Sequence, residues 1–186
     1  MRLWSIFCLA LFMLRVGPAV EVAAIVSRHV DGDTIRVTFP SLGDETSVRL
    51  LWIDTPESRG NAHGKAMPEG RAASAYLAAI LPVGSQVTLW GPGETLQADV
   101  YKRTLAVVLM PPVGVAEMKP RSSVQELMIA NGHTVYWRKY GEAPEPWHAR
   151  FLQAQQAAEE GGEGAWASAP KWMKDKANER TRPKGK

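Results

Sequence analysis

The chain has 186 residues, of which 45% are hydrophobic and 22% are charged, and it carries a formal net charge of +3. This composition is that of a globular domain, and it excludes a disordered, collagen-like or disulfide-rich chain. The length suits one self-sufficient core and is too short for two large domains. The positive charge is concentrated in residues 171–186, so the rest of the chain is close to neutral. Net charge alone therefore does not indicate a nucleic-acid partner.

The N-terminus is typical of a secretory signal peptide, which we place at residues 1–23. Residues 3–14 form one apolar run behind Met1 and Arg2, and small residues follow. The run is too short to span a bilayer comfortably, so we expect export to the periplasm or the medium without a permanent membrane anchor. A buried N-terminal helix is the less favoured alternative, because no polar face interrupts the run. The single cysteine, Cys8, lies in this leader, so the exported chain would have no disulfide, thiol nucleophile or cysteine-bound zinc.

The pattern after the leader predicts short strands with interspersed helices. Runs bounded by turn residues predict strands over residues 22–30, 34–39, 47–53, 86–90 and 101–110, with a brief one over 134–137. Helical spacing predicts about three helices, over residues 68–81, 123–130 and 145–160.

These elements favour a mainly β, α+β domain over residues 24–168. The five-stranded Greek-key barrel of the OB-fold is the expected architecture, with a β-sandwich as the alternative. We expect residues 169–186 to form a basic, disordered tail.

Charged residues gather at the ends of the predicted strands. They are Asp31 and Asp33 around the first turn, Arg49, Asp54 and Glu57 in and after the third strand, and Arg103 at the start of the fifth. Some fragments have a purely structural interpretation, since Asp-Gly-Asp-Thr makes a competent hairpin turn and Asp-Thr-Pro-Glu can cap a helix. Arg49 is harder to explain in this way, because a guanidinium inside an apolar strand needs a carboxylate or phosphate partner.

Together these side chains suit phosphodiester cleavage. Carboxylates that converge at a barrel end can hold a hard cation, which neutralises a phosphate oxygen and positions a water molecule. Two arginines can bind the other phosphate oxygens and stabilise the negative charge that develops on them. A further carboxylate can deprotonate the water. Asp33, Asp54, Glu57, Arg49 and Arg103 would supply all of these parts.

Three fragments in order carry a resemblance to a known family. They are VDGDT at residues 30–34, VRLLWIDTPE at 48–57 and DVYKRTLA at 99–106, with a weaker match at 124–132. Each is weak alone, but their order and spacing make the combination specific. Over residues 24–167 the sequence resembles the staphylococcal nuclease, or thermonuclease-like, family.

The resemblance implies a Ca²⁺-dependent endonuclease on an OB-fold barrel. Family members cut DNA and RNA and leave 3′-phosphate ends, and we expect a monomer that prefers single strands. The family pattern assigns the site residues as follows: Asp33, Asp54 and the Thr55 carbonyl as metal ligands, Asp31 as a carboxylate that orients them, Glu57 to activate water, and Arg49 and Arg103 to bind the phosphate.

Three further residues are implied to bind substrate. Tyr101 and Lys102 lie where family members contact a terminal phosphate. Tyr140 is the expected base-stacking residue, in competition with Tyr136 and Trp137.

Two other functions stay open at this point. An OB-fold module without catalytic activity could bind nucleic acid or protein, and a metal-dependent phosphodiesterase could act on small nucleotides. The complete set of acids and arginines favours the nuclease. The four histidines have no ligand spacing, so neither zinc binding nor histidine-based catalysis is expected.

Overall fold

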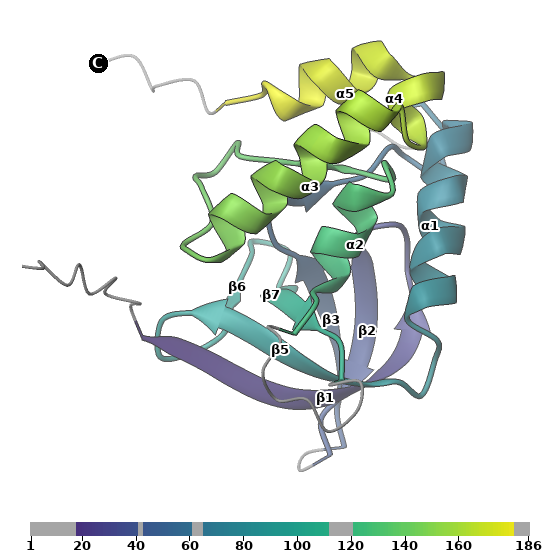
Figure 1. Cartoon of the computed structure of the whole chain (residues 1–186). Helices are drawn as coiled ribbons and strands as arrows, with labels where there is room; N and C mark the ends of the chain where they lie inside the picture. Colours follow the sequence, from purple (N-terminus) through teal and green to yellow (C-terminus); the bar gives the residue numbers. More distant parts are fainter. Residues whose placement is uncertain (1–17, 41–42, 61–64, 112–120, 181–186) are drawn as a thin grey trace, which may run out of the picture.

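The computed structural model describes residues 18–40, 43–60, 65–111 and 121–180 (Figure 1). Its strands are β1 (Ala19–His29), β2 (Thr34–Thr38), β3 (Glu45–Leu50), β4 (Ile53–Asp54), β5 (Gln86–Pro92), β6 (Gln97–Ala98), β7 (Thr104–Leu109) and β8 (Val135–Tyr136). Its helices are α1 (Pro68–Ile80), α2 (Val124–Ala130), α3 (Trp147–Gly161), α4 (Ala165–Ser168) and α5 (Pro170–Ala177).

Five of the strands close into a barrel. They follow the order β3-β2-β1-β5-β7, and a parallel pairing of β3 with β7 joins the two edges. Strand β6 extends β7 as a hairpin, and β4 pairs with β8 in a separate short sheet. This order and closure confirm the predicted five-stranded OB-fold barrel.

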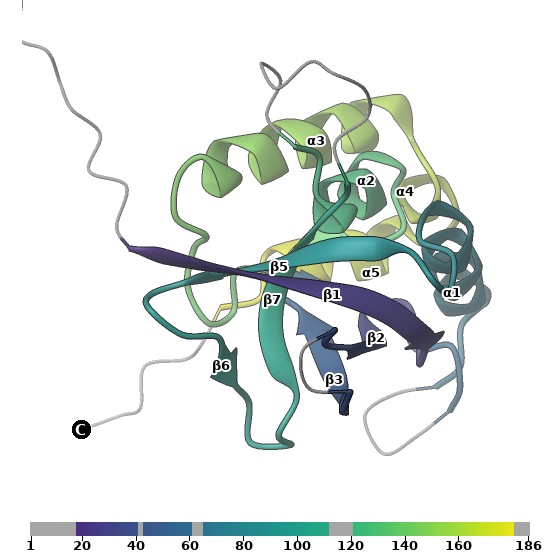
Figure 2. The same cartoon turned by 90° about the horizontal axis from the view of Figure 1, so that it is seen from below.

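Strand β1 is long because it pairs on both sides. Its first half pairs with β5 from Ala19 to Ile25, and its second half pairs with β2 from Ile25 to His29. The register shifts between Val26 and Arg28, and such a bulge bends a strand and increases its twist. Figure 2 shows β1 lying beside β5 and continuing to β2. The bend lets one strand serve both halves of the barrel.

The main core lies between the barrel and helices α1, α2 and α3. Its fully buried side chains include Ile35, Leu50, Leu77, Leu89, Met128 and Phe151. A buried polar side chain ties α2 to the barrel: Gln125 accepts from the Val108 N–H at 3.1 Å and donates to the Ala106 carbonyl at 2.9 Å. Buried polar groups are stable only when paired in this way.

Helix α5 lies in the segment that was expected to form a disordered tail. A second buried cluster joins Met173 and Ala177 of α5 to Val135 of β8, Ala158 of α3 and Trp166 of α4. Met173 and Ala177 are four residues apart, so both lie on the same face of α5. The prediction of disorder after residue 169 was therefore wrong for α5, and the described residues form five helices where about three were expected.

Two turns shorten predicted strands. The strand expected over 47–53 ends at Leu50, because Trp52 takes a left-handed conformation with φ of 58° before β4 begins. The strand expected over 101–110 starts at Thr104, after a turn that contains Lys102 at φ of 61°. Both turns place charged side chains at the barrel end, which is where the candidate site lies.

Most of the predicted leader, residues 1–17, lies outside the described residues. Strand β1 begins at Ala19, so the folded domain starts earlier than the expected residue 24. Within the described ranges, no helix has the length and apolar character needed to cross a membrane.

Candidate active site

Asp33 is positioned by the turn between β1 and β2. The ideal Cβ of an alanine at Gly32 would lie 2.8 Å from the Thr55 Oγ1 atom, so glycine lets this turn approach the segment after β4 closely. Across that contact, the Asp33 Oδ2 atom accepts from the Thr55 N–H at 3.2 Å and from its hydroxyl at 3.3 Å. Asp33 is 7% exposed, so its carboxylate depends on these partners.

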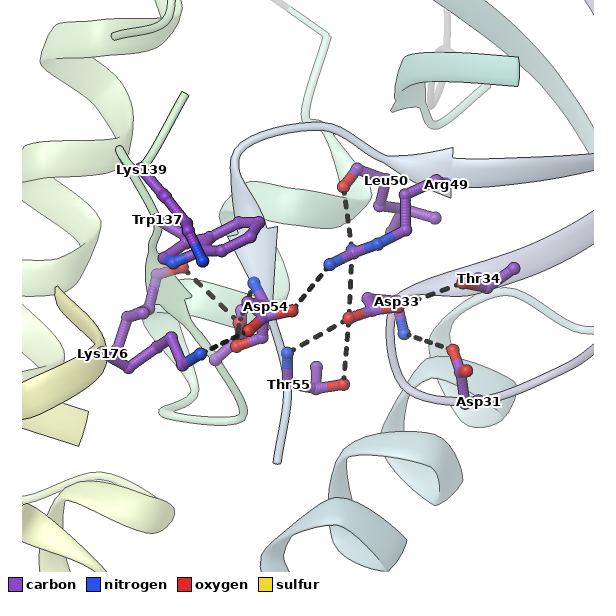
Figure 3. A network of polar contacts seen from close by, with 12 residues as sticks. Asp31, Asp33, Thr34, Arg49, Leu50, Asp54, Thr55, Trp137, Lys139 and Lys176 are labelled. Atoms are coloured by element: carbon purple, nitrogen blue, oxygen red, sulfur yellow. Dashed lines mark hydrogen bonds and ion pairs between the residues drawn. The ribbon is translucent and has the colours of Figure 1, made fainter. Parts of the chain in front are cut away.

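Arg49, from the end of β3, links two of the predicted acidic residues (Figure 3). Its Nη1 atom lies 3.0 Å from Asp33 Oδ2, and its Nη2 atom lies 2.7 Å from Asp54 Oδ1. The guanidinium also donates to the Leu50 carbonyl at 3.2 Å. The Arg49 side chain is 11% exposed, and a planar guanidinium with five donors suits such paired recognition. The expected carboxylate partners of this buried arginine are thus Asp33 and Asp54.

Asp54 is fixed by the pairing of β4 with β8. The Thr134 hydroxyl accepts from the Asp54 N–H at 3.1 Å and donates to the Asp54 carbonyl at 2.7 Å. Burial raises the pKa of Asp54 above its ordinary value, although the Arg49 guanidinium opposes the shift. An additional cation near this carboxylate would stabilise its charged form.

Asp31 lies beside the acidic pair. Its Oδ1 atom accepts from the Asp33 N–H at 3.2 Å. Burial, with the neighbouring charge of Asp33, raises the pKa of Asp31 to about 6. The Asp31 carboxylate is thus tied to the backbone of Asp33, one of the predicted metal ligands.

The backbone of Glu57, three residues after Asp54, is held by the start of α1. Its carbonyl accepts from the Met67 N–H at 2.8 Å. The ideal Cβ of an alanine at Gly70 would lie 2.4 Å from the Glu57 backbone, so only glycine allows α1 to pack this closely on the loop. The backbone of the predicted water-activating residue is thus fixed by its contact with α1.

Arg103 is held within the β6–β7 hairpin by a residue that sequence reasoning did not assign. The Asp99 carboxylate accepts from the Arg103 Nε atom at 2.8 Å and lies 2.7 Å from its Nη2 atom. It also accepts from the backbone N–H groups of Tyr101 and Arg103, each at 2.9 Å. The Arg103 Nη1 atom reaches the Thr34 hydroxyl at 3.5 Å, next to Asp33. The signal for Asp99 was available, because an aspartate that accepts from the N–H two residues on is a common turn former.

The predicted substrate-binding residues lie on the surface around this end of the barrel. Tyr101 is 69% exposed and Tyr140 is 77% exposed, and Lys102 is also exposed. Tyr136 is fully buried, and its hydroxyl pairs with His148 Nδ1 at 2.9 Å. Burial removes Tyr136 as a base-stacking candidate. Tyr140 packs edge-on against Trp137, with ring centroids 5.2 Å apart.

A second polar network, absent from the sequence predictions, reaches the site from α5 (Figure 3). The Lys176 Nζ atom lies 2.8 Å from Asp54 Oδ2 and 3.1 Å from Glu179 Oε2. Glu179 also pairs with Lys139 at 2.6 Å and accepts from the Trp137 indole N–H at 2.9 Å. Partial burial opposes ionisation of Glu179, but its donors outweigh burial and hold its pKa at about 2.

The donors around Asp33 and Asp54 are chemically suited to a hard cation. Among the described residues, no group of three or more His, Cys, Asp or Glu side chains is arranged to hold a metal ion. Two carboxylates with backbone carbonyls and water can nevertheless complete an oxygen shell of the kind that Ca²⁺ accepts. Both carboxylates are already paired with cationic groups of the chain, because Arg49 contacts Asp33 and Asp54 and Lys176 contacts Asp54, so an added cation would have to compete with these groups.

Comparison with known proteins matches most of the chain to one family. The family described as staphylococcal nuclease homologue matches residues 47–168. The chain is also 29% identical over 170 residues to endonuclease YhcR of Bacillus subtilis (strain 168). That match covers 89% of this chain but 13% of the length of the relative.

Proposed function

Because the chain belongs to the family of staphylococcal nuclease homologues, we propose that it is an exported, Ca²⁺-dependent endonuclease of DNA and RNA. Family membership and the endonuclease relative both support a nuclease, that is, a phosphodiester hydrolase. The apolar run at residues 3–14 supports export.

The observation that carries the proposal is the bridge that Arg49 makes between Asp33 and Asp54. This bridge brings two acids from separate parts of the sequence to one end of the barrel, next to the segment that holds Glu57. A catalytically silent OB-fold would not need a nearly buried arginine with two carboxylate partners at this position. The arrangement suits a site that must hold anionic substrate and cation together.

Each residue then has a role in hydrolysis. Asp33, Asp54 and the Thr55 carbonyl would hold Ca²⁺, which when bound would neutralise phosphate charge and help to position water. Glu57 would accept the proton of the attacking water.

The arginines stabilise the developing charge. Arg49 would exchange part of its contact with the carboxylates for a phosphate oxygen, while Arg103 binds another from the β6–β7 hairpin. The leaving group is the 5′ oxygen, so the products would carry 3′-phosphates.

Exposed aromatic residues near the site favour single strands as substrate. Tyr101 and Tyr140 present rings to solvent, and unpaired bases can stack on such rings whatever their sequence. We propose that Tyr101, with Lys102, lies near a terminal phosphate and that Tyr140 stacks on a base, in a chain that acts as a monomer.

The test is Glu57→Gln, with Glu69→Gln in the first turn of α1 as the matched control. Glu57→Gln should bind labelled single-stranded DNA as wild type does in Ca²⁺ while its cleavage rate falls by about a hundredfold or more. Glu69→Gln should keep both properties. Undiminished turnover by Glu57→Gln would remove this residue from the mechanism, and binding without cleavage by the wild-type chain would indicate a silent binding module.

A further inference from the structure

Helix α5 delivers an ammonium group to one of the proposed cation ligands. The Lys176 Nζ atom lies 2.8 Å from Asp54 Oδ2, and both side chains are 23% exposed. The other oxygen of the same carboxylate, Oδ1, is taken by Arg49 at 2.7 Å. Both oxygens of Asp54 therefore have a positively charged partner from the chain itself.

The position of Lys176 is set by more than this ion pair. Its ammonium lies over the rings of Trp137 and Trp172, at 5.4 and 5.7 Å from their centroids. Met173 and Ala177, on either side of it in α5, are buried in the second apolar cluster. The lysine is thus held at the site by a folded helix and two aromatic faces, which a side chain in a disordered tail would not have.

We propose that Lys176 is an internal cation that competes with the divalent ion for Asp54 and so sets the ion affinity of the site. The proposal rests on the cation site of the proposed function. A divalent ion bound at Asp54 Oδ2 would face an ammonium group on the same oxygen, and two like charges at this distance repel strongly where water is partly excluded.

Glu179 gives the displaced ammonium an alternative partner. Its Oε2 atom is already 3.1 Å from Lys176 Nζ, and Lys139 and Trp137 hold it in place. Lys176 can therefore leave Asp54 without losing every charged partner. Ion binding and the Lys176–Asp54 contact are coupled, and each weakens the other by the same factor.

The direct test compares Ca²⁺ affinity by titration calorimetry at neutral pH in the full chain and in two variants. Lys176→Met removes the ammonium and keeps an apolar stem against the two tryptophans. Lys171→Met is the control, because this lysine lies on the same helix and is 88% exposed. Lys176→Met should bind Ca²⁺ about tenfold or more tightly than wild type, while the control changes by less than about twofold.

A second measurement needs no variant. Lysines of the wild-type chain are acylated with an amine-reactive ester, and the rate at each site is read by peptide mass spectrometry. Ca²⁺ should speed acylation of Lys176 relative to Lys171, because the ammonium leaves Asp54. A structural role alone would not make the rate depend on Ca²⁺.

Equal or weaker Ca²⁺ binding by a folded Lys176→Met chain would overturn the proposal. So would a Lys176 acylation rate that Ca²⁺ leaves unchanged, or the absence of Ca²⁺ binding in both wild type and variant. If Lys176→Met does not fold, Lys176→Gln and the acylation rate give the same decision. Neither readout is cleavage, so a chain that meets both expectations without cutting DNA would contradict the proposed nuclease and leave the competition standing.

Discussion

Substitution of Asp99 by asparagine tests how the second arginine is positioned. The Asn Oδ1 atom can still accept from the backbone N–H groups of Tyr101 and Arg103, which the carboxylate binds at 2.9 Å. The amide nitrogen, however, replaces the oxygen that lies 2.7 Å from Arg103 Nη2. Asp99→Asn therefore keeps the hairpin turn and removes the partner of the guanidinium.

The expected loss follows from the exposure of the pair. A hydrogen bond to a charged group contributes about 1.5–3 kcal/mol, and side-chain exposures of 30% for Arg103 and 18% for Asp99 favour the lower end. A loss of about 1.4 kcal/mol of transition-state stabilisation, caused by a poorly positioned Arg103, corresponds to about a tenfold fall in kcat/KM. Stability to urea should fall by less than about 1 kcal/mol, because the backbone contacts remain.

The assay is kcat/KM on a labelled single-stranded oligonucleotide, measured in a double-mutant cycle with Arg103→Ala. Asp99→Asn should cost nothing further once Arg103 is absent, because its effect acts through that side chain. Wild-type activity in Asp99→Asn, or an equal loss in the Arg103→Ala background, would refute the assignment of Asp99 as a positioning residue.

Three other substitutions test the packing around the site. Gln125→Leu should lower the free energy of unfolding by about 2 kcal/mol in urea, because it leaves the buried Val108 N–H of β7 without its partner, while the Ala106 carbonyl still accepts from the Leu51 N–H; a loss below about 1 kcal/mol would show that the Val108 N–H finds another partner. Gly70→Ala should cost about 1–3 kcal/mol by pushing α1 away from Glu57, and cleavage should fall by more than the unfolded fraction explains; full activity in the folded protein would contradict that link. The pKa of Glu179 is lowered from 4.5 to about 2, so its ionised form stabilises the fold above pH 4.5, and this contribution is lost as pH falls toward 2. Glu179→Gln should therefore be less stable than wild type by about 1 kcal/mol at pH 7, with a gap that closes on acidification; a gap independent of pH would exclude the charge as its cause.

The barrel and the grouping of acids at its end were predictable because short sequence motifs indicate them. Arg49 in an apolar strand required a carboxylate or phosphate partner, and it binds Asp33 and Asp54, two of the acids in the strand-end motifs. The Asp-Gly-Asp sequence around Gly32 indicated the tight turn between β1 and β2. The pairing of β3 with β7 was implied by the fold and could not be derived from either strand alone.

Helix α5 was missed because its sequence pattern indicates a helix only weakly and because the contacts that stabilise it come from distant parts of the sequence. Its sequence is rich in lysine, and a polar C-terminal segment usually stays solvated. Met173 and Ala177 bury only two positions, and their partners Val135 and Ala158 are distant in the sequence. Lys176 could be assigned to the site only after this packing placed it beside Asp54.

The measurement that tests the central claim most directly is cleavage of end-labelled single-stranded DNA by the purified chain, with Ca²⁺ in one reaction and a chelator in the other. The proposed function predicts fragments with 3′-phosphate ends in Ca²⁺ and intact DNA with the chelator. DNA that stays intact in both reactions, or is cut equally in both, would contradict a Ca²⁺-dependent nuclease at the Asp33–Arg49–Asp54 site.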